Sequence, residues 1–266
     1  MQRLLASPDI IPSQGRRRSV TVLAAAPKGL PASVAAAQDP QDVVKLLTAY
    51  HAAVGEVILG LEGTLRQGGG DAVAAYFGAP FDCPDHARRA CRAAIRIKAV
   101  EKELNVIASA PFATRIGIDT GECIVGDIGG RGTPDFTVVG AATDLAARLE
   151  SLNARYGTAI LISESVRDAA GEDFLVRTLD RVRIAGTSSI FRVFELVAET
   201  DGAEPSMVEA IRIFNAGLAR FEEKQWRDAE ALFARALELR PVDGPAPIYI
   251  ERCRQHAANP AGPAPI

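Results

Sequence analysis

The chain has 266 residues, of which 48% are hydrophobic and 24% are charged, and its formal net charge at pH 7 is −3. This length is enough for one full domain and a smaller second one, and the composition is that of an ordinary globular protein. The near-neutral charge argues against nucleic-acid partners, because nucleic-acid-binding domains carry a basic footprint.

The N-terminal part predicts a tail, a strand and a long helix. Residues 1–15 are expected to be a flexible tail, and residues 19–25 to form a strand that is rich in β-branched side chains and ends before Pro27. Asp39 and Pro40 predict a helix start, because they provide an N-cap followed by proline at the first helical position. Apolar residues at helical spacing then continue this helix.

A glycine-rich turn joins two apolar runs in residues 63–78, and Asp71 follows the turn. The pattern predicts a β-hairpin that presents Asp71 at a fixed point, where its carboxylate would suit a hard cation such as Mg²⁺. The alternative is that Asp71 only begins a strand after the turn, where aspartate is common. The stretch alone favours this alternative, since single motifs give false positives.

Strands and helices alternate between residues 85 and 198. The expected elements are a helix from Asp85, strands over 112–120 and 122–128 joined at Gly121, a strand over 136–139, a helix over 142–152, a strand over 159–162, a short helix over 164–170, and strands over 174–184 and 191–196. Asp144 and Arg148 lie one turn apart in the helix over 142–152. The alternation predicts an α/β (α+β) sandwich with a mixed or antiparallel sheet.

The C-terminal part is purely helical in its pattern. Residues 199–206 have the composition of a linker, and residues 207–257 carry aromatic and small residues at the spacing of a helical hairpin with a third, capping helix. The hairpin fits one tetratricopeptide-like repeat of about 34 residues. Residues 258–266 are rich in proline and alanine and are expected to be disordered.

The cysteines and the hydropathy pattern indicate a cytoplasmic chain. The four cysteines form no C-x-x-C pair, which is typical of buried reduced thiols rather than of a disulfide framework or a zinc site. No apolar run reaches about 18 residues without charges, so no transmembrane segment is expected. The N-terminus lacks the long apolar core of a signal peptide.

Several motifs follow one another in the order of a known family. They are Gly70-Asp71 with Phe77-Gly78, Asp85-His86-Ala87-Arg88-Arg89-Ala90, Arg115-Ile116-Gly117-Ile118 with Gly121, Phe136-Thr137-Val138-Val139-Gly140, and Leu145-Ala146-Ala147-Arg148-Leu149-Glu150. In this order, over about two thirds of the chain, residues 16–198 resemble the catalytic domain of class III adenylate and guanylate cyclases. The resemblance implies a ferredoxin-type sheet with helices, a homodimer, and active sites at the dimer interface.

The resemblance also implies a chemistry, the conversion of ATP to cyclic AMP and pyrophosphate by a phosphorus-oxygen lyase with two Mg²⁺ or Mn²⁺ ions. Two aspartates of one subunit hold the ions in the family. At the first of these positions this chain has Ala26, in the run Ala24-Ala25-Ala26-Pro27, and at the second it keeps Asp71. One carboxylate is a weak holder for two ions, because Mg²⁺ gives up its water reluctantly.

The nucleotide-binding groups that the resemblance implies are also altered. The purine-reading lysine corresponds to Gln67, while its partner is kept as Thr137; Thr137 is equally well explained as an ordinary strand residue. The ribose-binding asparagine corresponds to Asp144, and the transition-state arginine is kept as Arg148, for which the alternative is a surface ion pair. The lysine on the distal phosphates corresponds to Ala185.

The identities of these residues are compatible with two functions. The altered positions favour a degenerate cyclase domain that dimerises or regulates in cyclic-nucleotide signal transduction, binds nucleoside triphosphate weakly, and uses Mg²⁺, Mn²⁺ or no ion. The retained Asp71, Thr137 and Arg148 support the alternative, an active adenylate cyclase with an altered site, alone or as the heterodimer partner of an active cyclase. The C-terminal helices would be available to a protein partner.

Overall fold

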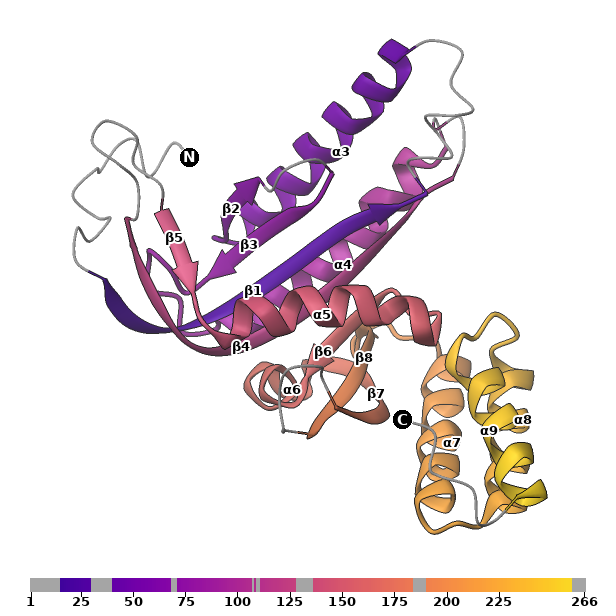
Figure 1. The fold of residues 1–266 in the computed structure, drawn as a ribbon. Coiled ribbons are helices and arrows are strands. Elements are labelled where there is room, and N and C mark those ends of the chain that lie inside the picture. The colour runs from indigo at the N-terminus through magenta and orange to yellow at the C-terminus, as the bar shows by residue number, and fades with distance from the viewer. Residues whose placement is uncertain are drawn as a thin grey trace.

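The computed structural model describes residues 15–29, 40–67, 71–106, 108, 111–127, 136–183 and 190–259, with Pro40 and Gln67 described by their backbone only. Figure 1 shows the elements in chain order. They are β1 (Arg16–Lys28), α3 (Pro40–Gly60), β2 (Thr64–Gln67), β3 (Val73–Phe77), α4 (His86–Leu104), β4 (Ala113–Asp127), β5 (Phe136–Val139), α5 (Ala141–Tyr156), β6 (Ile160–Ser163), α6 (Glu164–Ala170), β7 (Phe174–Arg183), β8 (Ile190–Glu199), α7 (Pro205–Glu222), α8 (Trp226–Leu239) and α9 (Pro245–Ala258). The predicted tails, the helix start at Asp39 and the Gly68-Gly69 turn lie wholly or largely outside the described residues.

The sheet is mixed, which confirms the predicted fold class. Its strands follow the order β2-β3-β1-β4-β6-β8-β7, and β5 pairs with β4 off this path. β4 and β6 are parallel, whereas the other pairs are antiparallel. The central pairing of the sheet is the ladder between β1 and β4. It runs from Arg16 opposite Val125 to Lys28 opposite Ala113 and includes all 13 residues of β1.

Two predicted strand boundaries are wrong. Residues 112–128 were expected to form two strands joined at Gly121, but β4 is one strand of 15 residues, and Gly121 pairs with Val20 inside it. The strand predicted to end before Pro27 also continues to Lys28. Both differences have one cause, since each strand gives the other a continuous pairing partner that outweighs the local preferences of glycine and proline.

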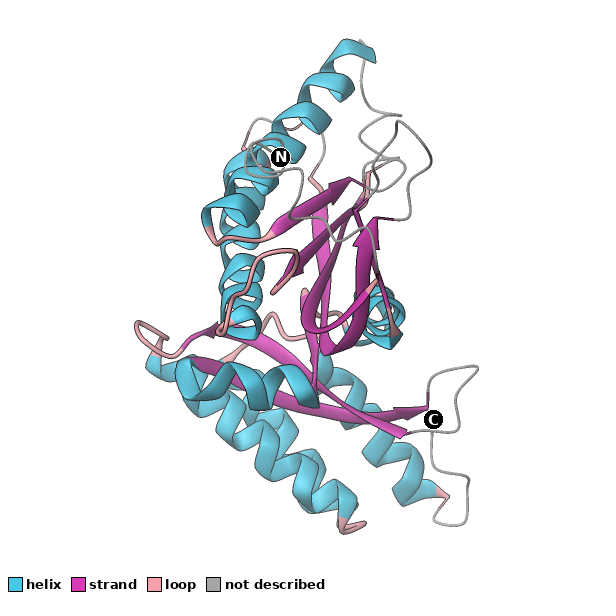
Figure 2. Cartoon of the chain, turned by 90° about the vertical axis from the view of Figure 1, so that its left-hand side faces the viewer, coloured by secondary structure: helices cyan, strands magenta, loops and turns pink. Residues whose placement is uncertain are grey.

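The two faces of the sheet carry separate apolar clusters. Helices α3 and α4 cover one face, where Tyr50 and Ile97 pack against Leu23 and Ile118. Helix α5 lies on the other face, over residues such as Val22. Figure 2 shows helices on both sides of the strands, so that most side chains of the central strands are buried.

α3 is a long and apolar helix. Among the described helices, α3 has over Gln41–Gly60 the length and composition that would allow a helix to cross a membrane, although no such segment was expected. Its Tyr50, Val54 and Ile58 are buried in the cluster against the sheet. Only 28% of this stretch is buried, so α3 packs against the sheet along one side, while apolar residues such as Val44 and Leu59 are exposed.

α5 is seated directly on β4. A Cβ atom at Gly117 would lie 2.1 Å from the carbonyl oxygen of Ala146 and 2.2 Å from the amide nitrogen of Glu150, so only glycine allows this approach. One helical turn further on, Asn153 Nδ2 donates to the carbonyl oxygen of Ile116 at 2.9 Å. These contacts fix the helix along the strand.

The three C-terminal helices pack on the sheet rather than apart from it. Phe214, Phe233 and Tyr249, one from each helix, belong to the same buried cluster as Leu179 of β7 and Tyr156 of α5. The expected linker over 199–206 is short in the structure, since β8 ends at Glu199 and α7 begins at Pro205. The domain boundaries and the tetratricopeptide assignment stay predictions.

A buried ion cluster adds to this contact. The Arg177 guanidinium of β7 bonds Glu195 of the neighbouring strand and, at 2.8 Å, the carboxylate of Asp243 between α8 and α9. Buried charges are tolerated only when they are paired in this way, so the cluster holds the α8–α9 connection against the sheet in one arrangement.

Candidate functional site

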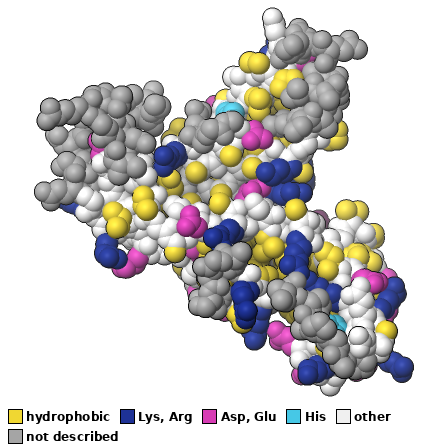
Figure 3. All heavy atoms as spheres, viewed as in Figure 1, with side chains coloured by type: hydrophobic (Ala, Val, Ile, Leu, Met, Phe, Trp, Pro, Cys, Tyr) yellow, Lys and Arg dark blue, Asp and Glu magenta, His cyan; other side chains and the backbone are white. Residues whose placement is uncertain are grey.

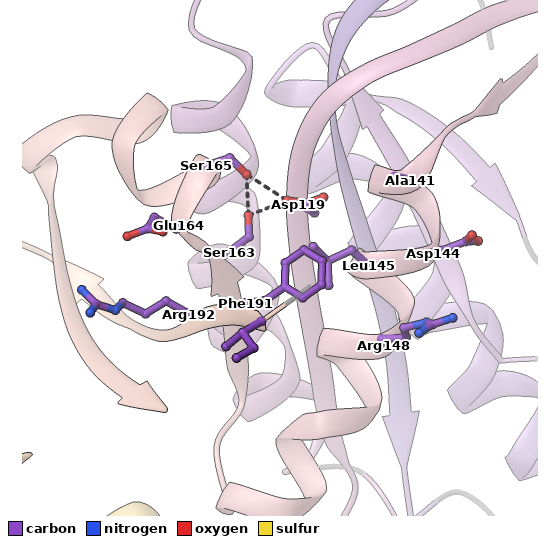
Figure 4. Close-up of a pocket in the computed structure, with 11 residues that line it drawn as sticks. Asp119, Ala141, Asp144, Leu145, Arg148, Ser163, Glu164, Ser165, Phe191 and Arg192 are labelled. Carbon is purple, nitrogen blue, oxygen red and sulfur yellow. Dashed lines mark hydrogen bonds between the residues drawn. The ribbon is translucent and has the colours of Figure 1, made fainter. Parts of the chain in front are cut away.

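The first part of α5 presents Asp144 and Arg148 on its outer side. Both side chains are exposed. Figure 4 shows them extending from the helix in the same direction, one turn apart. The structure therefore brings together the two predicted residues of this helix on an open surface, which is where a ligand or a second chain could reach them.

The two positions of the expected metal pair also lie near each other. The ladder of β1 and β3 ends with Ala25 opposite Val73, so Ala26 and Asp71 follow at the same end of the ladder. Ala26 is only 5% exposed, whereas Asp71 is half-buried. Within the described ranges, no group of three or more His, Cys, Asp or Glu side chains is placed to hold a metal ion. Of the two positions, only Asp71 carries a carboxylate.

The two members of the predicted purine-reading pair, Gln67 and Thr137, come from the strands β2 and β5. Thr137 is buried at 5% exposure on β5, opposite Gly126 of β4. Gln67 ends β2 opposite Val73, and its side chain lies outside the described residues, as does the whole of Ala185. Thr137, the one member of this set with a described side chain, has the burial of a structural strand residue.

A cavity of about 310 Å³ opens beside α5, between this helix, the end of β6 and the beginning of β8. Its position follows from the topology, because β6 ends at Ser163 while the parallel strand β4 runs on. Clefts at the carboxyl ends of parallel strands are common ligand sites in α/β folds. Side chains that line it include Asp119, Leu145, Arg148, Ser163, Ser165 and Phe191.

Asp119 forms the polar floor of this cavity. It follows Ile118, which pairs with Ile162, and so lies beside Ser163. Ser163 Oγ donates to Asp119 Oδ1 at 2.5 Å and Ser165 Oγ donates to the same atom at 3.0 Å. Burial raises the pKa of Asp119 above its ordinary value, although the two hydroxyls and the Thr120 backbone oppose this shift.

Ser163 holds a second contact that fixes the floor. As the N-cap of α6, its Oγ accepts from the amide nitrogen of Val166 at 3.3 Å. The cap therefore positions Ser163, and Ser163 in turn positions the carboxylate of Asp119. Because serine and aspartate side chains are short, fixing them in this arrangement costs little side-chain entropy.

Sequence reasoning missed the floor of the cavity. Asp119 directly follows the Arg115-Ile116-Gly117-Ile118 motif, and an acidic residue after a buried apolar strand run was the available signal. Phe191 and Arg192 were read only as parts of a strand. Their place beside α5 depends on the pairing of β6 with β8, which no local pattern specifies.

The surface around α5 is mixed in character. On the face drawn in Figure 3, basic and acidic side chains are interspersed with hydrophobic ones over the described residues. This face thus presents no continuous basic area of the kind that binds nucleic-acid backbones.

Comparison with known families identifies relatives for most of the chain. Residues 14–196 match the family described as "Adenylate and Guanylate cyclase catalytic domain". The chain is 32% identical over 194 residues to "Adenylate cyclase 1" of Rhizobium meliloti (strain 1021), which covers 70% of this chain and 28% of the relative. It is 29% identical over 224 residues to "Adenylate cyclase, terminal-differentiation specific" of Dictyostelium discoideum, covering 81% of this chain and 10% of the relative. The chain thus spans less than a third of the length of each of these two relatives.

Solved structures show the same fold. The guanylyl cyclase Cya2 superposes with a TM-score of 0.62 and 30% identity, over 72% of this chain and 96% of the other. The adenylyl cyclase CyaB from P. aeruginosa superposes with a TM-score of 0.64 and 24% identity, over 72% of this chain and 100% of the other. These likenesses cover less than three quarters of the chain, and the family match ends before α7.

Proposed function

The chain belongs to the family of adenylate and guanylate cyclase catalytic domains, and from this premise we propose that its own catalysis is impaired or lost. On this proposal it acts as a dimerising or regulatory module in cyclic-nucleotide signalling. The observation that carries the proposal is Ala26. An aliphatic side chain, 5% exposed within the central ladder, occupies the position where the resemblance implies the first metal-binding carboxylate.

The loss of this carboxylate acts on the first chemical step. In the family, metal ions activate the ribose hydroxyl and bind the triphosphate. Asp71 alone would have to hold a strongly hydrated ion. A single protein carboxylate binds Mg²⁺ only when phosphates or further ligands complete the coordination shell of the ion. The expectation for this chain is weak binding of one ion together with nucleotide.

The nucleotide-facing changes add to this effect. Asp144 places an exposed carboxylate where the resemblance implies a neutral amide, and this charge repels the phosphates. Ala185 removes the cation that would face the distal phosphates. Removal of a single electrostatic group of this kind typically costs about 10²–10³ in rate. Several changes in one site leave little turnover, although their effects need not add.

A second candidate function has its own supporting observation. Arg148 is retained and exposed on the outer side of α5, beside a shallow groove that Ser151 and Arg155 also line. A partner subunit with both aspartates would meet Arg148 at this surface. The chain would then supply the transition-state arginine to a heterodimer whose partner holds the ions.

Dimerisation supports both functions. The outer side of α5 carries small residues such as Ala147 and Ala154, which allow close approach of a second chain. A stable interface of this family type would bury upward of about 2,000 Å². Sedimentation of the purified protein at micromolar concentration measures this directly, and a homodimer is the expected state.

Turnover assays separate the two functions. Purified protein alone is incubated with ATP or GTP and either Mg²⁺ or Mn²⁺, and cyclic nucleotide is quantified. Little or no product is expected. The same protein is then mixed with an aspartate-bearing cyclase subunit whose own arginine position is mutated. Product that appears only in the mixture, and disappears with Arg148→Ala, would support the heterodimer. Robust product from the protein alone that Asp71→Ala abolishes would overturn the proposal of impaired catalysis.

A further inference from the structure

We propose that the C-terminal helices are a regulatory clamp on α5, coupled to the outer side of this helix through its C-terminal end. A partner that displaces α9 would loosen α5, and a second chain held on α5 would in turn stabilise α9. Two features carry this coupling, the contact between the ends of α5 and α9 and the seat of α5 on β4. Neither feature depends on whether the chain retains catalysis of its own.

The end of α5 and the start of α9 meet backbone to backbone. Gly157 ends α5 in the left-handed conformation, with a φ of 64°, and Gly244 is the residue that precedes α9. A Cβ atom at Gly244 would lie 2.3 Å from the carbonyl oxygen of Tyr156 and 2.5 Å from that of Gly157. Only glycine fits at this contact, so the position where α9 begins depends on the position where α5 ends. Figure 1 shows the C-terminal end of α5 reaching these helices.

The two helix ends also complement each other electrostatically. The last carbonyl oxygens of α5 carry the partial negative charge of a helix C-terminus, and the first amides of α9 carry the partial positive charge of an N-terminus. Asp243 fixes this start, because its Oδ2 accepts from the amide nitrogen of Ala246 and its Oδ1 accepts from Arg177 of β7, each at 2.8 Å. The first turn of α9 is therefore held both to the sheet and against α5.

A side-chain link repeats this connection about two turns further along α9. The carboxylate of Asp180 accepts from Tyr156 of α5 and from Arg252 of α9. The Arg252 guanidinium also lies over the ring of Tyr249, 4.8 Å from its centre, and the Tyr249 hydroxyl donates to the carbonyl oxygen of Leu179. A displacement of α9 would therefore break the backbone contact and the charged link together.

α5 transmits a change at this end to the surface that bears Asp144 and Arg148. Arg148 lies about 14 Å along the helix from Gly157, and the seat of α5 lies close to Arg148, because the nearest neighbour of a Cβ at Gly117 is the carbonyl oxygen of Ala146. A rigid, closely packed helix moves as one body, and packed helices typically shift by about 1–2 Å. A shift at the end of α5 therefore reaches its seat and its exposed side chains.

The position of the C-terminal helices suits a regulatory element. They lie beyond residue 196, where the match to the catalytic-domain family ends, and so are an addition to the matched domain. They contact the end of α5, whereas Asp144 and Arg148 in its first half stay exposed. An added element that holds one end of a helix can change the open surface of that helix without covering it.

Hydrogen–deuterium exchange of the full chain, measured by mass spectrometry, tests the coupling in both directions. Gly244→Ala disturbs the helix ends, since its nearest neighbours are residues 156 and 157, and it should speed exchange at least tenfold in residues 141–150. Gly117→Ala disturbs the seat, where its nearest neighbours all belong to α5, and it should speed exchange at least tenfold in residues 245–258. Coupling between two sites is reciprocal, so both effects are required.

Ile58→Ala is the matched control, because Ile58 is buried in the cluster between α3 and the opposite face of the sheet. It should lower the melting temperature and speed exchange in α3, with exchange in α9 unchanged. Should Gly244→Ala not fold, Asp180→Asn removes the charged link and leaves the glycine contact, with the same expected effect on α5. Unchanged exchange in α9 of folded Gly117→Ala, or in α5 of folded Gly244→Ala and Asp180→Asn, would overturn the proposal. Equal acceleration of α9 in Ile58→Ala would do the same, since it would show a loss of global stability instead of coupling.

Discussion

The hydroxyl of Tyr156 donates a hydrogen bond of 2.7 Å to the carboxylate of Asp180, and so ties the last turn of α5 to strand β7. The same carboxylate oxygen accepts from Arg252 Nη1 of α9 at 2.8 Å. One side chain thus connects the helix that carries Asp144 and Arg148 with the C-terminal helices. The charged partner contributes more than the phenol, since hydrogen bonds to charged groups are the stronger kind.

This triad predicts an order of stability losses. Tyr156→Phe should lower the free energy of unfolding by about 1 kcal/mol, the typical net value of one hydrogen bond. Asp180→Asn should cost more, because it leaves the largely buried Arg252 without its carboxylate. Urea denaturation of both variants measures the difference. A larger loss for Tyr156→Phe than for Asp180→Asn would contradict the assignment of Asp180 as the centre of the triad.

The C-terminal helices are predicted to need the sheet. Phe233 is fully buried in the cluster that also contains Leu179 and Tyr156, so these helices lack a complete core of their own. A segment of residues 205–266 alone should show weak helicity and no cooperative melting. In the full chain, Phe233→Ala should cost about 3–5 kcal/mol and lower one common transition. Cooperative melting of the isolated segment as a monomer would refute this prediction.

Gly117 is predicted to be intolerant of any side chain. Gly117→Ala would place a Cβ 2.1 Å from the Ala146 carbonyl oxygen and so push α5 off β4. The expected loss of stability is about 1–3 kcal/mol or more, the range for overpacking. Gly121→Ala is the matched control, because a Cβ there meets only the Ala142 Cβ, at 3.9 Å. Equal melting temperatures of the two variants would contradict the close packing of the helix.

Restoration of the catalytic site should require several substitutions together. Ala26→Asp returns the carboxylate beside Asp71, yet alone it should improve Mn²⁺-nucleotide binding with little gain in turnover. Asp144→Asn removes the repulsive charge, and Gln67→Lys with Ala185→Lys returns the purine and phosphate contacts. The combined variant should make measurable cyclic AMP with Mn²⁺.

Arg148→Ala in the combined variant is the control for this restoration. It should remove the gained activity, because Arg148 is the retained group for the transition-state charge. High activity from Ala26→Asp alone would show that the other changes are tolerated. No activity from the full combination would mean that backbone geometry limits the site, since misplacement by about 1 Å can cost about 10² in rate.

His86 is predicted to make stability depend on pH. Its Nδ1 lies 2.6 Å from Thr21 Oγ1, and burial lowers its pKa below the ordinary 6.5, although Asp85 opposes the shift. The unfolded chain therefore takes up the proton first as the pH falls. The stability that neutral His86 contributes is complete above pH 6.5 and is lost as the pH falls through the folded pKa. Melting temperatures from pH 8 to pH 5 should decline less in His86→Asn, and parallel curves would contradict this.

Much of the fold was predictable because it rests on local patterns. The apolar spacing of α5 and α8 and the β-branched run of β1 specify those elements whatever lies beside them. The boundary errors at Gly121 and Pro27 arise where a distant strand supplies the pairing, as in Gly121 opposite Val20. Such contacts join residues about a hundred positions apart, and no window of sequence contains them.

The site was predictable only in part for the same reason. Asp144 and Arg148 lie one turn apart on one helix, so their shared face follows from helical geometry. The cavity floor combines Asp119 of β4 with Ser163 and Ser165 after β6, and it exists because these strands are parallel neighbours. A sequence alone does not state which strands are neighbours.

The ladder of β1 and β4 also bears on how the chain can change over evolutionary time. Ala26 takes part in it through its backbone, opposite Arg115, and backbone pairing does not depend on the side chain. The alanine at this buried position therefore keeps the ladder, while it leaves the position without a carboxylate. Selection for a folded, assembling protein would keep the frame and let the metal ligand drift, so in this fold catalysis can be lost without any loss of shape.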